Sequence, residues 1–189
     1  MSKTESEVSS TLESKQPIAK WKQLLQDYLI PCLMGAGIAW FIHAFIFFTA
    51  YVPSGSMEPT IMTGEKMLVA YCYDTDQLER GDIVVFESEE YGKYFVKRLI
   101  GKGGDKVELL EDGSVRLNGK LLDEPYVVNP VTFQLAQTFT VPDGHFFFLG
   151  DNRMDSHDAR YWNEPFISEE AILGTPFLTI SPLKDLRRL

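Results

Sequence analysis

The sequence is poor in cysteine: Cys32 and Cys72 are the only two in 189 residues. Two cysteines cannot build a disulfide framework or a cysteine-based metal site. Cys32 lies within a long apolar run. Cys72 lies far beyond it, where we expect a small core residue and not a reactive thiol. The cysteine content is compatible with either redox compartment.

The sequence also lacks an excess of basic residues. Its 18 lysine and arginine residues face 27 aspartate and glutamate residues, for a formal net charge of −9 at pH 7. Residues 1–27 carry four charges of each sign and residues 28–50 carry none, so the whole excess lies in residues 51–189. Phosphate binding needs clustered lysine and arginine. This balance argues against nucleic-acid binding and predicts a solvated acidic surface.

Formal charge is absent from residues 28–50, which are rich in Phe, Ile, Leu and Ala. As an α-helix this run would be about 34 Å long, enough to cross a hydrocarbon core of about 30 Å. Pro31 would fall in the first turn, where its missing N–H does no harm. A cleaved signal peptide is the alternative, but the run is long, starts late and is followed by Pro-Ser-Gly-Ser. We therefore predict an uncleaved transmembrane anchor.

The lysines around this anchor predict its orientation. Three lysines lie between residues 15 and 22, whereas the first basic residue after the anchor is Lys66. Positively charged flanks stay on the cytoplasmic side of a membrane. Residues 1–27 are therefore predicted to be a cytoplasmic tail, and residues 51–189 an extracytoplasmic domain at the cell membrane.

Beyond the anchor, helical periodicity is scarce, and short apolar blocks alternate with Gly and Pro turns. Residues 83–86 form an apolar block bounded by turn residues, as expected of a buried strand. Residues 137–141 and 145–149 are predicted to pair across Pro142-Asp143-Gly144. The other expected strands, some joined by Asp-Gly and Asn-Gly hairpin turns, are 65–71, 93–101, 105–111, 114–117, 120–122 and 172–180. We therefore predict a mainly β ectodomain.

A stiff, serine-containing segment follows the anchor: Pro53-Ser54-Gly55-Ser56-Met57-Glu58-Pro59-Thr60. Its prolines restrict the backbone and Gly55 permits a bend, which is one way to hold a serine in a fixed orientation. Such clusters are usually plain loops. A serine hydroxyl also needs a base before it can attack, so the importance of this segment depends on the rest of the chain.

Three residues beyond the anchor are considered as the base. His145 begins an apolar strand, and His157 stands in a Ser-His-Asp string, whose adjacency is no sign of a triad because triad members meet in space. Lys97 has apolar neighbours on its own face of a predicted strand, and burial would lower its pKa and leave a neutral amine. Arg98 is flanked just as apolarly on the other face, so the pattern alone does not single out Lys97.

A third polar cluster, Gly-Asp-Asn-Arg-Met-Asp-Ser-His-Asp-Ala-Arg at residues 150–160, directly follows an apolar strand. It can be interpreted as a solvated turn or as a network of buried ion pairs that braces a site. A calcium loop does not fit, because the alternating carboxylates and the distal glutamate are missing.

Together these segments resemble the type I signal peptidase family, the membrane-bound Ser/Lys endopeptidases that remove signal peptides from exported proteins. The resemblance covers residues 28–181. It rests on an N-terminal anchor followed by four ordered motifs: P-S-G-S-M-E-P-T (53–60), R-G-D-I-V-V-F (80–86), K-R-L-I-G-K-G-G-D-K-V (97–107) and G-D-N-R-M-D-S-H-D-A-R-Y-W (150–162).

The resemblance implies a role for each matched residue. Ser56 would be the nucleophile and Lys97 the general base. Ser54 would contribute its hydroxyl to the oxyanion hole, and Ser156 would hydrogen-bond the lysine amine and orient it. Two structural ion pairs are implied near the site, Arg98 with Asp151 and Asp158 with Arg160.

The resemblance also implies a signal-peptidase-like β-fold of short antiparallel strands behind one transmembrane helix. The partners would be signal peptides of secreted preproteins and the lipid bilayer, with cleavage after small residues in an Ala-X-Ala-like pattern. No metal or cofactor is expected, and the protein is expected to be a monomer in the membrane. The chain departs from the family pattern at two positions: Gly103 stands where the family commonly has proline, and Ala159 where it commonly has serine. Loss of that serine would loosen the surroundings of the site.

Two alternatives to such a peptidase remain open at this point. One is an inactive paralogue that serves as a membrane-bound binding module for exported chains, and the other is a self-cleaving Ser/Lys repressor-type protein. A self-cleaving Ser/Lys repressor shares the chemistry, but the anchor and the acidic ectodomain argue against it.

Overall fold

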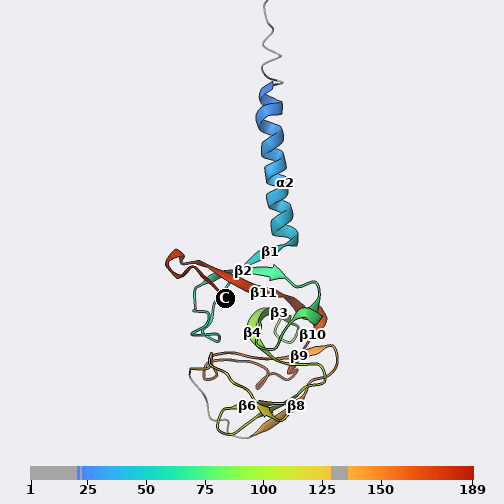
Figure 1. Cartoon of the computed structure of the whole chain (residues 1–189), viewed down its shortest axis with the longest axis vertical. Coiled ribbons are helices and arrows are strands. Elements are labelled where there is room, and N and C mark those ends of the chain that lie inside the picture. Colours follow the sequence, from blue (N-terminus) through green and yellow to red (C-terminus); the bar gives the residue numbers. More distant parts are fainter. Residues whose placement is uncertain (1–20, 22, 129–135) are drawn as a thin grey trace, which may run out of the picture. The chain divides into compact units, whose positions relative to one another are not determined.

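The computed structural model describes residues 21, 23–128 and 136–189, and the chain divides into two compact units, Met1–Ile42 and His43–Leu189. An apolar helix runs through η1 (Leu25–Leu29) and α2 (Ile30–Phe45) (Figure 1). These 21 residues are long and apolar enough to cross a membrane.

Pro31 does not lie in the first turn of this helix, because helical residues precede it from Gln23 onward. The turn before it is π-helical, and there the Ile30 N–H bonds to the Leu25 carbonyl, five residues back. Proline cannot donate the usual bond to the carbonyl four residues back, and a local widening of the helix is one way to accommodate it. The predicted position of Pro31 is therefore wrong.

The helix ends at Phe45, and Phe47–Tyr51 forms strand β1, which pairs antiparallel with β2 (Lys66–Tyr71). Aromatic and β-branched side chains favour a strand here. The backbone of β1 finds its hydrogen-bond partners in β2 and not along a helix. The prediction that the apolar run is helical as far as Ala50 is therefore wrong at its end.

The second unit is mainly β, as predicted. Within the described residues its larger sheet has eight strands in the order β1-β2-β11-β3-β4-β9-β10, with β12 paired to β11, and all of these pairs are antiparallel. Its remaining strands are β3 (Ile83–Ser88), β4 (Lys93–Lys102), β9 (His145–Leu149), β10 (Phe166–Ser168), β11 (Ile172–Ser181) and β12 (Arg187–Arg188). Single 3₁₀ turns are η2 (Thr75–Gln77), η3 (Glu169–Ala171) and η4 (Leu183–Asp185).

A smaller antiparallel sheet has the order β7-β6-β5-β8. Its strands are β5 (Lys106–Leu109), β6 (Val115–Leu117), β7 (Lys120–Leu121) and β8 (Gln137–Thr140). The predicted Asn-Gly hairpin joins β6 to β7, and both turn residues have positive φ, 50° at Asn118 and 81° at Gly119. This is the left-handed conformation that such a turn requires.

The predicted pairing of residues 137–141 with 145–149 is wrong. Strand β8 pairs with β5 in the smaller sheet, while β9 pairs with β4 and β10 in the larger one. Val141 fixes the exit from β8, because its N–H donates to the Asp105 carbonyl at 2.8 Å and its carbonyl accepts from the Gly104 N–H at 2.9 Å. Pro142-Asp143-Gly144 is therefore a crossing between sheets and not a hairpin turn.

Two apolar clusters cover the two faces of the central strands. The first draws side chains from both sheets and contains Phe86 stacked on Phe148 at 4.5 Å between ring centroids. The second lies with the serine-containing segment and includes Met57 and Ile61. Strand β3 serves both, because Phe86 enters the first cluster and Val85 the second. Burial of each such side chain stabilises the fold by about 1.5–3 kcal/mol. Strand β3 and its neighbour β4 are therefore firmly held in the sheet.

Candidate active site

The serine loop, residues 52–65, is closed at its base by backbone hydrogen bonds. The Val52 N–H donates to the Glu65 carbonyl at 3.0 Å, and the Gly64 N–H donates to the Val52 carbonyl at 2.8 Å. Met57 and Ile61 are fully buried and join the core, which holds the loop down on the sheet. Ser56, next to Met57, is itself only 5% exposed. Its position is therefore set by packing on one side and by a closed backbone on the other.

Gly55 is small enough to leave space for the Glu58 side chain within the serine loop. A Cβ there would lie 3.2 Å from the Glu58 Cδ, a tight contact. The Glu58 carboxylate accepts hydrogen bonds from the Thr63 N–H at 3.1 Å and from the Thr63 hydroxyl at 2.8 Å. The absent side chain thus makes room for a carboxylate that bridges the loop.

Lys97 lies in β4, between β3 and β9, and its Nζ is 2.6 Å from Ser56 Oγ. The side chain is 2% exposed, and burial lowers the pKa of the amine from 10.5 to about 8, although the carboxylate of Asp158 favours the charged form. The Phe95 ring centroid lies 5.7 Å from Nζ. The amine is therefore partly neutral near pH 8, and a neutral amine can accept the serine proton.

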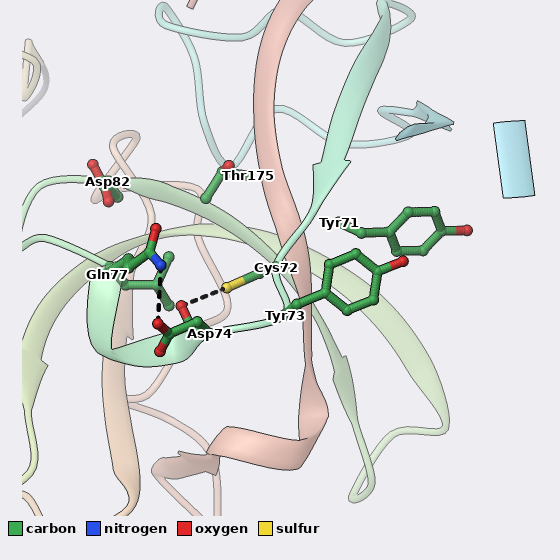
Figure 2. A pocket seen from close by; sticks show the side chains of 8 residues that line it. Tyr71, Cys72, Tyr73, Asp74, Gln77, Asp82 and Thr175 are labelled. Carbon is green, nitrogen blue, oxygen red and sulfur yellow. Dashed lines mark hydrogen bonds between the residues drawn. The ribbon is translucent and has the colours of Figure 1, made fainter. Parts of the chain in front are cut away.

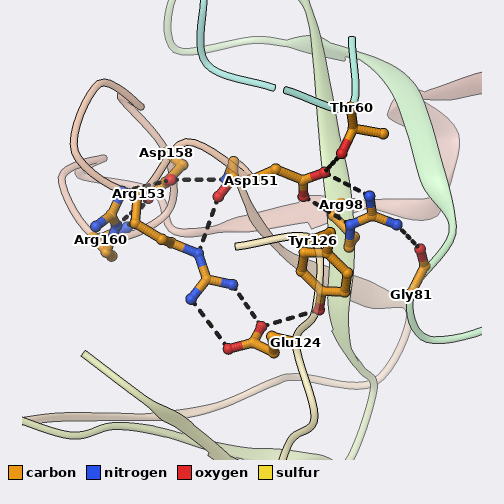
Figure 3. A network of polar contacts seen from close by, with 10 residues as sticks. Thr60, Gly81, Arg98, Glu124, Tyr126, Asp151, Arg153, Asp158 and Arg160 are labelled. Atoms are coloured by element: carbon orange, nitrogen blue, oxygen red, sulfur yellow. Dashed lines mark hydrogen bonds and ion pairs between the residues drawn. The ribbon is translucent and has the colours of Figure 1, made fainter. Parts of the chain in front are cut away.

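Arg98, the other candidate cation of this strand, has a different environment (Figure 3). Its Nε and Nη2 donate to the Asp151 carboxylate at 2.7 and 2.5 Å, and Nη1 donates to the Gly81 carbonyl at 2.6 Å. The guanidinium also stacks over the Tyr126 ring at 3.9 Å. Arg98 is therefore held as a charged, paired group, and Lys97 is the cation that reaches the serine.

The polar turn, residues 150–160, contacts the serine loop at several points. The Asn152 N–H donates to the Ser56 carbonyl at 3.1 Å, and its side-chain amide donates to the Gly55 carbonyl at 3.1 Å. The Thr60 hydroxyl donates to Asp151 at 2.6 Å. These bonds fix the backbone on both sides of the Ser56 hydroxyl.

Gly150 allows the polar turn to lie close to the serine loop. A Cβ at residue 150 would lie 2.5 Å from the Ser56 carbonyl oxygen and 2.2 Å from Ser156 Oγ. Real Cβ atoms are not found at such distances, so any other residue would push the two segments apart. The sequence shows Gly150 only as a turn residue after a strand, and nothing in it indicates this contact.

The second predicted ion pair is also present in the polar turn. Asp158 is fully buried; it accepts from Arg160 Nε at 2.7 Å and from the Gly150 N–H at 2.9 Å. Ala159, between the two partners, is 1% exposed and belongs to the first apolar cluster. Of the two interpretations of this segment, the buried ion-pair network is confirmed, and the solvated turn is wrong.

Sequence reasoning missed one part of the network, the pair of Arg153 with Glu124. Arg153 is 1% exposed; its Nη2 donates to Glu124 at 2.5 Å and its Nε donates to the Gly150 carbonyl at 3.0 Å (Figure 3). Tyr126, which stacks on Arg98, also donates its hydroxyl to Glu124 at 3.0 Å. Nothing in the spacing of Glu124 and Tyr126 indicates this arrangement, because both residues lie outside the four sequence motifs.

The two remaining predicted serines differ in their surroundings. Ser54 is exposed, two residues before Ser56. Ser156 is buried, and within the described residues its Oγ has no hydrogen-bond partner, so the expected bond to the Lys97 amine is absent from the structure. The orienting role of Ser156 and the oxyanion role of Ser54 stay predictions.

The two histidines that follow the apolar helix, His145 and His157, contact other groups. His145 begins β9, as predicted, with its Nδ1 2.9 Å from the Asp143 carbonyl oxygen. His157 Nε2 lies 2.9 Å from the Tyr91 hydroxyl. The Ser-His-Asp string therefore gives no triad geometry here. In the part of the chain that the structure describes, no group of three or more His, Cys, Asp or Glu side chains could hold a metal ion.

Cys72 lines a separate cavity of about 410 Å³ together with Tyr71, Tyr73, Asp74 and Gln77 (Figure 2). Burial raises the pKa of its thiol, and its Sγ lies 3.5 Å from the Asp74 carbonyl oxygen. A raised pKa keeps the sulfur as a thiol, which is a poor nucleophile. Cys72 packs partly buried against the first apolar cluster, as expected of a small core residue.

Comparison with known proteins gives the family of this fold and site. The family model described as "Signal peptidase, peptidase S26" matches residues 25–180. A probable signal peptidase I-2 from Synechocystis sp. is 33% identical over 189 residues, 95% of this chain and 83% of the relative. Signal peptidase I from Bacillus licheniformis is 32% identical, over 88% of this chain and 94% of the relative.

A solved signal peptidase I from Enterococcus faecalis V583 is 32% identical in sequence; the match covers 52% of this chain and 96% of that one, with a TM-score of 0.46. By the match over most of its length, the chain is a peptidase of the class that processes signal peptides. It belongs to the signal peptidase family, peptidase S26.

Proposed function

We propose that the protein is a membrane-bound serine endopeptidase that removes N-terminal signal peptides from exported preproteins, with Ser56 as nucleophile and Lys97 as general base. The observation that carries this proposal is the 2.6 Å contact between Lys97 Nζ and Ser56 Oγ in a buried site, where the pKa of the amine is lowered to about 8. A lysine in water would be protonated at neutral pH and could not take up the serine proton.

The proposed reaction is acyl transfer in two steps. The neutral Lys97 amine takes the Ser56 proton as Oγ attacks the scissile carbonyl carbon, and the resulting ammonium gives that proton to the leaving amine as the peptide bond breaks. The Ser56 N–H and the Ser54 hydroxyl hold the oxyanion. In the second step Lys97 takes a proton from water as the water oxygen attacks the carbonyl carbon of the acyl ester, and the resulting ammonium returns that proton to Ser56 Oγ as the ester bond breaks.

Anchoring and orientation are part of the same proposal. The helix Leu25–Phe45 holds the chain in the cell membrane and takes the place of the predicted anchor 28–50, because Phe47–Tyr51 is a strand of the larger sheet. Residues 1–27 lie in the cytoplasm and residues 51–189 outside it, in accordance with the lysines that precede the anchor. The protein acts as a monomer at the bilayer surface, where the signal peptide of a preprotein emerges, and cuts after small residues in an Ala-X-Ala-like pattern.

Cleavage of a preprotein by the full chain in detergent tests the proposal. Ser56→Ala and Lys97→Met should each abolish cleavage, and Ser54→Ala should lower kcat by about 10²–10³-fold through loss of one oxyanion donor. Lys93→Met is the matched control, because Lys93 is an exposed lysine at the start of the same strand. Cleavage by Lys97→Met at a rate near that of wild type would contradict the base assignment. No cleavage by wild type would favour the binding-module alternative.

A further inference from the structure

Residues 182–189, here called the return strap, fold back along the sheet toward the serine loop. Within the strap, β12 pairs with β11, with Arg187 opposite Thr179. The Leu189 N–H donates to the Phe177 carbonyl at 3.1 Å, and its side chain packs against the second apolar cluster. That cluster contains Met57, the neighbour of Ser56. The strap thus ends on the same core that supports the serine loop.

Arg187 carries the polar contact between the strap and the loop. Its Nη1 and Nη2 donate to the two oxygens of Glu65 at 2.7 and 2.9 Å, and Nη2 also donates to the Thr60 carbonyl at 2.7 Å. Glu65 is 2% exposed, and its carboxylate also accepts from the Met62 N–H at 3.2 Å. A buried carboxylate needs such a partner, and the planar guanidinium fits it through two parallel bonds.

Thr60 is held from two directions. Its hydroxyl donates to Asp151 of the polar turn at 2.6 Å, while its carbonyl accepts from Arg187 of the strap at 2.7 Å. Thr60 lies inside the turn closed by the bond from the Ile61 N–H to the Met57 carbonyl at 2.9 Å. That turn begins directly after Ser56, so a shift of Thr60 would be passed to the serine.

We propose that Arg187 is a positioning residue, which keeps the serine loop in the register that sets Ser56 against the Lys97 amine. This inference rests on the proposed function of Ser56 and Lys97. Arg187 touches neither of them, and it acts through Glu65 and Thr60. Without the Arg187 guanidinium, the buried Glu65 carboxylate has no charged partner. It then becomes hydrated, and the serine loop moves away from the sheet.

Arg187→Ala should therefore lower kcat for preprotein cleavage by about 10–100-fold, the scale expected when reacting groups are displaced by up to about 1 Å. KM should change much less. Water that enters beside Lys97 should also raise the apparent pKa of the acid limb of kcat above that of wild type, because desolvation is what lowers the pKa of the amine. If Arg187 contributed only to global stability, the folded fraction of Arg187→Ala would show the same acid-limb pKa of kcat as wild type.

Arg188→Ala is the matched control, because it removes the same charge from the exposed neighbour on β12 and should leave kcat within twofold. Arg187→Lys keeps the charge but loses the two parallel bonds, so it should restore part of kcat. If Arg187→Ala does not fold, the double variant Glu65→Gln/Arg187→Gln removes the buried charge together with its partner. It should fold and show the same loss of kcat.

Amide hydrogen exchange reports the loop without any cleavage. The amides of Ile61 and Gly64, both hydrogen-bonded within the serine loop, should exchange at least tenfold faster in Arg187→Ala than in Arg188→Ala. Unchanged exchange with unchanged kcat in a folded Arg187 variant would overturn the inference. If Ser56→Ala cleaved like wild type in the same assay, the proposed function would fail instead, and the exchange rates would still test the strap.

Discussion

Replacing Lys97 by methionine is expected to make the protein more stable at neutral pH while it removes the proposed base. The amine is buried, and burial lowers its pKa from 10.5 to about 8. At pH 7, about one pH unit below its folded pKa of about 8, the amine is mainly protonated in the folded state and fully protonated in the unfolded state, so the folded state bears the cost of a charge in an apolar setting. At about 1.4 kcal/mol per pH unit, that cost is about 3 kcal/mol.

The sign and the pH window follow from proton linkage. Between pH 8 and 10.5 the unfolded chain binds the proton and the folded protein does not, so wild type gains stability as the pH rises through this window. Below pH 8 the cost is fully present, and above 10.5 it is gone. The advantage of Lys97→Met should therefore be about 3 kcal/mol larger at pH 7 than at pH 10.5. Loss of the hydrogen bond to Ser56 changes the stability of Lys97→Met by the same amount at both pH values, so it does not alter this difference.

Thermal unfolding in detergent, followed by tryptophan fluorescence, measures this difference. For a domain of this size about 3 kcal/mol corresponds to a Tm difference of about 6–12 °C at pH 7, which should shrink steadily toward pH 10.5. Lys93→Met removes an exposed lysine from the same strand and should show no such trend. A Tm difference between wild type and Lys97→Met that stays constant from pH 7 to 10.5 would refute the lowered pKa.

Three further outcomes are expected. The kcat for preprotein cleavage should rise with pH along an acid limb centred near 8, because deprotonation of Lys97 activates it; a limb centred below 7 in a pH–rate profile would point to a different base. Gly150→Ala should lower kcat at least 100-fold and stability by about 1–3 kcal/mol, since its Cβ would meet the Ser56 carbonyl oxygen; kinetics and thermal unfolding would check both, and near-normal kcat would contradict the close approach. Asp151→Asn should cost about 3–5 kcal/mol in denaturant unfolding, because it leaves the Arg98 guanidinium without a charged partner; a loss below about 1 kcal/mol would show that the pair adds little.

The sequence predicted the strands of the ectodomain better than their partners. Short apolar blocks and the turn residues between them located β3, β4 and β11, because those signals are local. Pairing depends on contacts far apart in the chain, and the Pro-Asp-Gly turn at residues 142–144 therefore gave a false hairpin. The end of the helix was missed for the same reason, since β1 is a strand only because β2 lies beside it.

The sequence named candidate site residues but gave no geometry for them. The apolar pattern did not distinguish Lys97 from Arg98 as the base. In the structure Arg98 pairs with Asp151, whereas Lys97 contacts Ser56. The motif resemblance resolved that choice, but it gave no account of Gly150 or Arg187. Their contacts join segments that no short-range pattern connects.

The return strap also has a consequence for the order in which the molecule is completed. Arg187 lies 122 residues after its partner Glu65, and β12 is the last strand in chain order. A chain made from its N-terminus therefore presents Ser56, Lys97 and the polar turn long before Arg187 exists. During that interval the Glu65 carboxylate has no guanidinium to pair with. The serine loop can therefore be secured through Arg187 only after residue 187 has been added, later than Ser56, Lys97 and the polar turn.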